Sequence, residues 1–125
     1  MNLPQPEEFI DIHTHGSTPV KGIFAVENMM AHEEHVPEDL TAKAFTAGIH
    51  PWYLNESNKT GLIEYVKDIS SDPRLIALGE AGFDKLRGPS MELQRLVFME
   101  QAKIAGSLNK PLIIHCVKAW DELFK

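Results

Sequence analysis

The amino-acid sequence predicts an α/β fold in which helices cover a parallel β-sheet. Short, continuously apolar segments alternate with amphipathic ones along the 125 residues. That alternation is typical of parallel sheets that are covered by helices. Ionisable side chains also stand at the points where the apolar segments would end as strands. In parallel α/β folds, functional sites form outside the carboxyl ends of the strands. The sequence therefore predicts a site at that edge of the sheet.

Five apolar segments are expected to form strands. The predicted strands are residues 8–12, 22–27, 42–49, 75–78 and 111–114. The predicted helices are residues 58–69 and 90–108, with a third helix beginning near residue 120. In the first helix, apolar side chains recur at i, i+3, i+4 and i+7, which places them on one stripe. The order β-β-β-α-β-α-β-α over residues 1–125 predicts a single domain.

Local signals support the ends of several of these elements. Pro51 favours extended geometry at His50, which suits the end of the third strand. Ser90 is expected to cap the helix that begins there. Pro111 lies just beyond the expected end of that helix. The polar and acidic segment 28–40 receives no predicted element.

The composition is that of a soluble globular protein, with 43% hydrophobic and 24% charged residues. A formal net charge of −6 means that no basic patch indicates nucleic acid, and it disfavours anionic membrane surfaces. A cation bound in the site would still allow phosphate to bind. The single cysteine, Cys116, excludes an intramolecular disulfide. With no apolar run long enough for a membrane span or a signal peptide, the expected compartment is the cytoplasm.

His13 and His15 are the first candidates for a functional site. They stand two residues apart at the end of the first apolar segment, and side chains at i and i+2 of a strand share a face. Gly16 allows a sharp turn directly afterwards. Catalytic metal sites commonly use three protein ligands and leave one position open. Two imidazoles would supply two of these three ligands. Taken alone, the motif is explained equally well by a strand whose two histidines bind no metal.

Further candidate ligands follow the later strands. His50, Glu80 and His115 each come at or just after the end of an apolar segment. Imidazole and carboxylate ligands together suit a divalent metal such as zinc, manganese or nickel. A carboxylate such as Glu80 can bridge two ions, and two ions clamp the oxygens of a phosphoryl displacement. Taken singly, Glu80 can also be a loop carboxylate, His115 a core histidine, and His50 a brace for the turn.

Other reactive or aromatic residues have simpler interpretations. Cys116 is expected to be a small buried residue beside the site and not a nucleophile. His32 and His35 are interpreted as part of a solvated acidic face. The aromatic segment 52–54 can line a substrate pocket, but aromatic side chains after a strand more often belong to the core.

These motifs give the sequence a specific resemblance to a known family. The matching segments are Asp11–His15, Gly48–Pro51, Gly79–Asp84, Gln94–Phe98, and Asn109–Pro111 leading into Ile113–His115. In order and context they resemble the TatD-like metal-dependent deoxyribonuclease family, whose members are amidohydrolase-type (β/α)8 barrels. The resemblance implies two divalent metal ions (zinc, manganese, magnesium or nickel) and DNA as the substrate. It also implies hydrolysis by metal-bound hydroxide.

The resemblance also implies roles for individual residues. His13 and His15 would bind one metal ion, Glu80 would bridge two, and His115 would bind the second. His50 and Asp84 would lie close to the site, and together with Glu80 they are the candidates for catalytic roles.

The sequence departs from the family pattern in several places. Phe83 stands where leucine is usual, and Val117-Lys118 where Arg-Asp is common. These differences bear on substrate preference more than on metal binding. A (β/α)8 barrel needs about 250 residues, and this sequence ends at Lys125. The expected fold is therefore a partial TIM barrel of about five parallel strands with flanking helices. The three C-terminal strands, with a further histidine and a late aspartate, would be absent.

The main functional hypothesis is a TatD-type hydrolase that cleaves DNA phosphodiester bonds, with activity expected to be very weak or absent in this 125-residue chain. One alternative is a metal-dependent amidohydrolase or esterase that acts on a small molecule. Another is a non-catalytic half-barrel that self-associates through its open sheet edges, because unpaired edge strands invite pairing with another chain.

Overall fold

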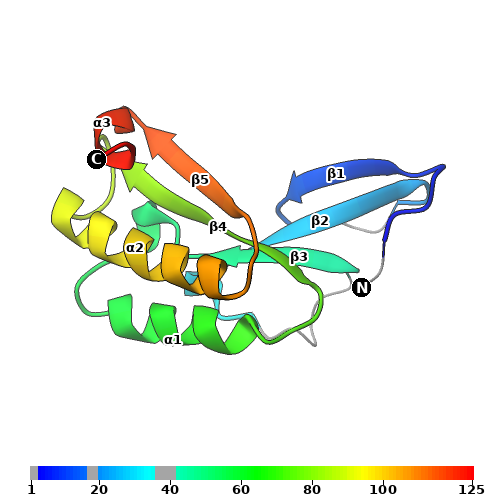
Figure 1. The fold of residues 1–125 in the computed structure, drawn as a ribbon, viewed down its shortest axis with the longest axis horizontal. Helices are drawn as coiled ribbons and strands as arrows, with labels where there is room; N and C mark the ends of the chain where they lie inside the picture. The colour runs from blue at the N-terminus through cyan, green and yellow to red at the C-terminus, as the bar shows by residue number, and fades with distance from the viewer. Residues whose placement is uncertain (1–2, 17–19, 36–41) are drawn as a thin grey trace.

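The computed structural model describes residues 3–16, 20–35 and 42–125, and it has the predicted α/β architecture. All strand pairs are parallel, in the order β1-β2-β3-β4-β5. The strands are β1 (Phe9–Thr14), β2 (Ile23–Met30), β3 (Ala44–Gly48), β4 (Leu75–Asp84) and β5 (Leu112–Val117). The helices are α1 (Lys59–Ile69), α2 (Met91–Ser107) and α3 (Trp120–Leu123), with short 3₁₀ turns η1 (Ala31–Glu33) and η3 (Pro51–Tyr53). The curled five-stranded sheet with flanking helices confirms the partial TIM barrel (Figure 1).

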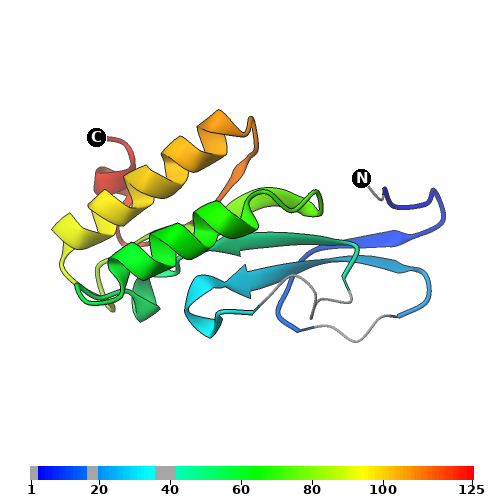
Figure 2. The same ribbon diagram turned by 90° about the horizontal axis from the view of Figure 1, so that it is seen from below.

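The two long helices pack side by side against the same face of the sheet, over β3 and β4 (Figure 2). Their apolar stripes and the strands beneath them form the main core, which includes Phe45, Val66, Leu78 and Val97. Helix α2 begins at Ser90, whose Oγ accepts a hydrogen bond from the backbone N–H of Leu93 at 3.3 Å. Both helices match the predicted ranges to within one residue at each end.

Four of the five strands end later than predicted, whereas β3 is shorter than its predicted range of 42–49, and the longer β4 changes where the site residues lie. β4 was expected to end at Leu78, but it runs to Asp84, so both of its carboxylates lie within the strand. Its second half pairs with β5 from Ala81 to Asp84 after a shift in register. Gly82, with φ +154°, makes this pairing possible, because a Cβ there would collide with the carbonyl oxygen of His115. The glycines thus allow close strand pairing where the sequence pattern indicates a loop.

The segment 28–40 is also more ordered than predicted at its start. β2 continues through Met30, and the turn η1 follows it. Parallel pairing of Asn28, Met29 and Met30 with β3 explains the extension. Residues 36–40 of that segment lie outside the described residues.

The face of the sheet opposite the helices is open around β1 and β2. β1 is an edge strand, and its Ile10 and Ile12 side chains are exposed on this face. An apolar cavity of about 490 Å³ lies against this face, lined in part by Ile10, Phe24 and Ile76. Among the described residues, no helix has the length and apolar character needed to cross a membrane.

Candidate metal centre

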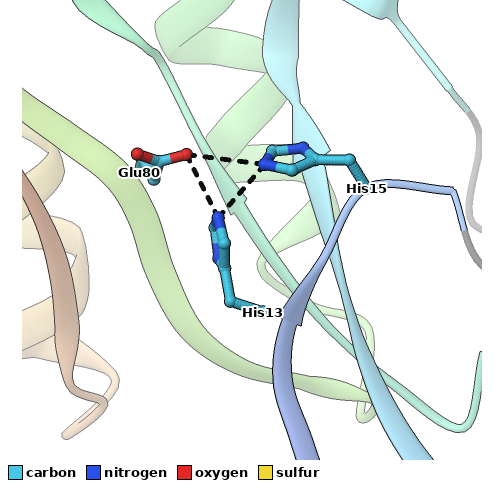
Figure 3. Close-up of side chains that lie close together, drawn as sticks. All are labelled: His13, His15 and Glu80. Carbon is cyan, nitrogen blue, oxygen red and sulfur yellow. Dashed lines mark hydrogen bonds and ion pairs between the residues drawn. The ribbon is translucent and has the colours of Figure 1, made fainter.

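Three side chains converge beside the end of β1 and the middle of β4. His13 lies in β1, His15 follows it, and Glu80 lies in β4 (Figure 3). His13 Nε2 is 3.3 Å from Glu80 Oε1, His15 Nε2 is 3.7 Å from the same oxygen, and the two Nε2 atoms are 3.1 Å apart. The two rings meet edge to face at a centroid distance of 4.8 Å. Three potential ligand atoms therefore face one another, as the i, i+2 spacing predicts.

A second group shares Glu80. His115 Nδ1 lies 3.5 Å from Glu80 Oε2, the carboxylate oxygen that does not face His13 and His15. The His50 ring packs against the His115 ring at 4.3 Å between centroids. His50, Glu80 and His115 each have a ligand atom within 4.8 Å of the others, as do His13, His15 and Glu80. The two oxygens of Glu80 thus face two different sets of histidines.

Burial sets the protonation state of His50. The residue is only 5% exposed, and its Nδ1 accepts a hydrogen bond from the backbone N–H of Trp52 at 3.2 Å. Burial, and then the charge of neighbouring His115, lower the pKa of His50 from 6.5 to about 4. At neutral pH the ring is therefore uncharged, which is the form that binds a metal ion. Because Nδ1 accepts a hydrogen bond, the proton of the neutral ring is on Nε2, which is therefore a hydrogen-bond donor and not a metal ligand in this tautomer.

Asp84 lies behind His115 and is ionised. It is 3% exposed, and its Oδ2 accepts a hydrogen bond from Trp52 Nε1 at 2.7 Å and lies 3.1 Å from His115 Nε2. Its Oδ1 accepts from the backbone N–H groups of Leu86 and Arg87. Burial opposes ionisation, but the hydrogen bonds from Trp52, His115 and the backbone outweigh it and lower the pKa of Asp84 to about 2. An ionised carboxylate at this place orients the His115 ring and turns Nδ1 towards Glu80.

A buried amide supports the backbone next to Glu80. Asn28 Nδ2 donates hydrogen bonds of 2.8 Å to Thr46 Oγ1 and to the carbonyl oxygen of Gly79. Both Asn28 and Thr46 are almost fully buried. The sequence analysis did not identify either residue. For Thr46 the available signal was a polar residue within an apolar segment, whereas Asn28 begins the polar segment 28–40 and carried no such signal.

Two glutamines on α2 hold the ends of β3 and β4. Gln94 accepts from the backbone N–H of Asp84 at 2.8 Å and donates to its carbonyl oxygen at 3.0 Å. Gln101 accepts from the backbone N–H of Ile49 at 2.7 Å, next to His50. Each glutamine is 1% exposed. Their seven-residue spacing on the buried helix face was the signal that could have assigned them this supporting role.

The remaining candidates border the two groups: Trp52 meets the His115 ring, and His35 lines a cavity together with His15. The His32 ring stacks on Tyr53, and His35 pairs with Glu33. Among the described residues, neither histidine belongs to a group of three or more potential metal ligands. Leu54 is in the core, whereas Trp52 and Tyr53 are each 37% exposed, so the expectation that these aromatic side chains are core residues is wrong for two of the three positions. Cys116 is a free, half-buried thiol.

A curled sheet of parallel strands, with histidines near the strand ends and a carboxylate within β4, defines a barrel-type protein with a candidate metal centre. The family described as TatD related DNase matches residues 10–125. This chain therefore belongs to the TatD-related DNase family, and the resemblance identified from the sequence motifs is confirmed.

Similar proteins include three with informative names. A human protein named 3′-5′ RNA nuclease TATDN2 is 38% identical over 74% of this chain and 12% of its own length. The 3′-5′ ssDNA/RNA exonuclease TatD of Escherichia coli K12 is 35% identical over 61% of the chain and 29% of its own length. A protein of Buchnera aphidicola named an uncharacterized metal-dependent hydrolase is 38% identical over 56% of the chain and 26% of its own length. The chain thus spans less than a third of each relative.

Proposed function

We propose that this chain is the N-terminal part of a metal-dependent nuclease that hydrolyses phosphodiester bonds of single-stranded DNA or RNA. The observation that carries the proposal is the sharing of Glu80. One of its oxygens faces His13 and His15, and the other faces His115. The names of the similar human and bacterial proteins support nucleic acid as the substrate class.

The donor set fits divalent metal ions. Imidazole nitrogens and a carboxylate in two groups, each with its ligand atoms within 4.8 Å, match the ligands of zinc, manganese and nickel sites. In the proposed assignment, His13 and His15 would bind one ion, His115 would bind a second, and Glu80 would be shared between them. His50 would lie beside His115, with its Nε2–H as a hydrogen-bond donor. A bound divalent ion supplies a nucleophilic water near neutral pH and stabilises charge on phosphoryl oxygens.

The residues around the ligands orient them. Asp84 accepts a hydrogen bond from His115 Nε2 and fixes the direction of that ring, the arrangement in which a carboxylate commonly supports a metal-binding histidine. Asn28 holds the carbonyl group that precedes Glu80. We propose that Asp84 acts through His115 and does not contact substrate, since it is buried.

Metal content tests the ligand assignment. Replacing both His13 and His15 by alanine is expected to lower zinc or manganese affinity about 100-fold or more, because even a partner of a ligand contributes about 10–100-fold. The matched control replaces His32 and His35, which lie outside both groups. Calorimetric titration and elemental analysis give the readout. Equal metal binding by the two double variants would show that the ligand assignment is wrong.

Substrate panels separate the hydrolase classes. The chain is assayed with manganese or magnesium on single-stranded DNA, single-stranded RNA and small amides and esters. Phosphodiester cleavage that is lost in the Glu80→Gln variant is the expected result. Hydrolysis confined to the small-molecule substrates would favour the amidohydrolase or esterase alternative.

A second candidate function is self-association through β1, which the exposed apolar side chains of this edge strand favour. Phe9 is 81% exposed and Ile12 is 71% exposed, and an unpaired edge invites another strand. Sedimentation velocity over a range of protein concentrations is the test. Association that Ile12→Lys weakens supports the proposal, and a monomer at all concentrations contradicts it.

A further inference from the structure

Trp52 and Arg87 form a stacked pair beside the candidate metal centre. The Arg87 guanidinium carbon lies 4.1 Å from the centroid of the Trp52 ring. The Trp52 ring in turn meets the His115 ring edge to face, with 5.9 Å between centroids. The indole is 37% exposed, and Arg87 is exposed. A fixed positive charge therefore lies at the surface next to a group that we assign to metal binding.

Asp84 holds both members of the pair in place. Its Oδ2 accepts a hydrogen bond from the indole Nε1 at 2.7 Å, and its Oδ1 accepts one from the backbone N–H of Arg87 at 3.0 Å. The carboxylate oxygens accept hydrogen bonds from these groups, and no ion pair joins them to the Arg87 guanidinium among the described residues. Because the ring and the backbone are both anchored, binding an anion at Arg87 would cost little ordering of side chains.

The charge of Arg87 is available to a ligand. Its neighbours on the loop and on α2 are already paired, Lys85 with Asp121 and Arg95 with Glu122. Among the described residues, no ion pair joins the Arg87 guanidinium to an acidic side chain. Stacking on an aromatic ring leaves the in-plane N–H donors of a guanidinium free, and these donors match the oxygens of a phosphate group. In a chain of net charge −6, this cation is well placed to receive an anionic substrate.

We propose that Arg87, held against Trp52, binds a backbone phosphate of single-stranded nucleic acid next to the phosphodiester bond that reaches the metal centre. The proposal rests on the proposed nuclease function, and it adds a substrate-binding residue to it. Neither residue is a metal ligand in our assignment. The pair sets the position of the strand, and it favours substrates with a second phosphate over those with a single one.

Oligonucleotide binding at several salt concentrations tests the proposal on the 125-residue chain. The probe is a fluorescein-labelled octathymidylate, measured by anisotropy both in EDTA and with manganese at a time before cleavage. Each phosphate contact contributes about 0.7 to the slope of log K against log salt for a single strand. Arg87→Gln is therefore expected to reduce the slope by about that amount and the affinity by about 5- to 10-fold at low salt.

Lys43→Gln is the matched control, because it removes the same charge from an exposed residue just before the start of β3, away from the carboxyl edge of the sheet. It is expected to leave the slope unchanged. Arg87→Lys keeps the charge and is expected to retain the slope. Trp52→Leu removes the stacking surface and is expected to weaken binding about as much as Arg87→Gln. In a Trp120→Phe background Trp52 is the sole tryptophan, so its emission reports directly on ligand binding beside Arg87.

The outcomes separate this inference from the nuclease proposal. If Arg87→Gln and Lys43→Gln show the same affinity and slope, the phosphate site at Arg87 is wrong, whether or not the protein binds metal. If the wild-type chain does not bind the oligonucleotide with or without manganese, the inference is also overturned. A chain that binds no metal, but whose binding in EDTA depends on Arg87, would overturn the nuclease proposal and support this site.

Discussion

His50 should make the metal-free protein less stable as the pH falls below neutrality. Its pKa is about 4 in the folded chain and 6.5 as the unperturbed value. Between these two values the unfolded chain binds a proton that the folded chain does not, so lowering the pH favours unfolding. The stabilising effect of neutral His50 is fully present above about pH 6.5 and is lost progressively towards pH 4.

The size of the effect follows from the two pKa values. Between pH 7 and pH 5, the proton uptake of unfolded His50 shifts the unfolding equilibrium about 20-fold, or about 2 kcal/mol. For a chain of this size, unfolding in urea has a slope of about 2 kcal/mol per molar. The midpoint is therefore expected to fall by about 1 M because of this one residue.

Urea unfolding in EDTA, at pH 7 and pH 5, measures the effect. The comparison is between the wild-type chain and His50→Asn, so that the effect of this one residue is isolated. The asparagine Oδ1 can accept the hydrogen bond that the Trp52 N–H donates to His50 Nδ1, and asparagine does not titrate. From pH 7 to pH 5, the free energy of unfolding of the variant is expected to fall by about 2 kcal/mol less than that of the wild-type chain. A difference below about 0.5 kcal/mol would show that His50 is not held neutral by burial.

Three further substitutions test the supporting residues. Gln94→Leu should lower the free energy of unfolding in urea by about 2–4 kcal/mol, since it leaves buried backbone groups of Asp84 unpaired. The control Lys103→Leu, at an exposed position on the same helix, should change the free energy of unfolding by no more than about 0.5 kcal/mol. Asn28→Leu should lower metal affinity about 10-fold by calorimetry and destabilise the fold by about 1–3 kcal/mol, because it leaves the buried Thr46 hydroxyl and the Gly79 carbonyl without the donor Asn28 Nδ2; an unchanged affinity would contradict the role given to Asn28. Cys116→Ser should leave any hydrolysis nearly intact, and a loss of two orders of magnitude at constant metal content would indicate covalent chemistry.

Local sequence signals were sufficient for the helices. The stripe in α1 and the Ser90 cap of α2 depend on residues within one or two turns, so their ranges could be predicted to within a residue. The strand positions of the histidines followed from similarly local patterns. The i, i+2 spacing of His13 and His15 is sufficient to place the rings together once β1 is extended.

The second half of β4 could not be predicted from local signals. Its glycines and carboxylates are typical of a loop, and only pairing with β5 makes the segment a strand. The hydrogen bonds from Gln94 to Asp84, and from Asn28 to Gly79, join distant parts of the chain. No sequence motif pointed to Arg87. It became a candidate binding residue only because it stacks on Trp52, which lies 35 positions earlier in the printed sequence. Such pairings are set by tertiary packing, which periodicity and spacing do not report.

The two carboxylates of β4 show how the fold gives the same functional group two different roles. Glu80 and Asp84 are four positions apart in one strand, and an even spacing in a strand directs side chains to the same face. Asp84 is surrounded by hydrogen-bond donors from Trp52, Leu86 and Arg87, so its oxygens are already used and it can only support its neighbour His115. Glu80 has the side chains of three histidines about it and a side chain that is 20% exposed. Glu80, whose oxygens face histidine side chains, is thus the carboxylate suited to bind metal. Asp84, whose oxygens already accept hydrogen bonds, is suited to hold the ligands in position.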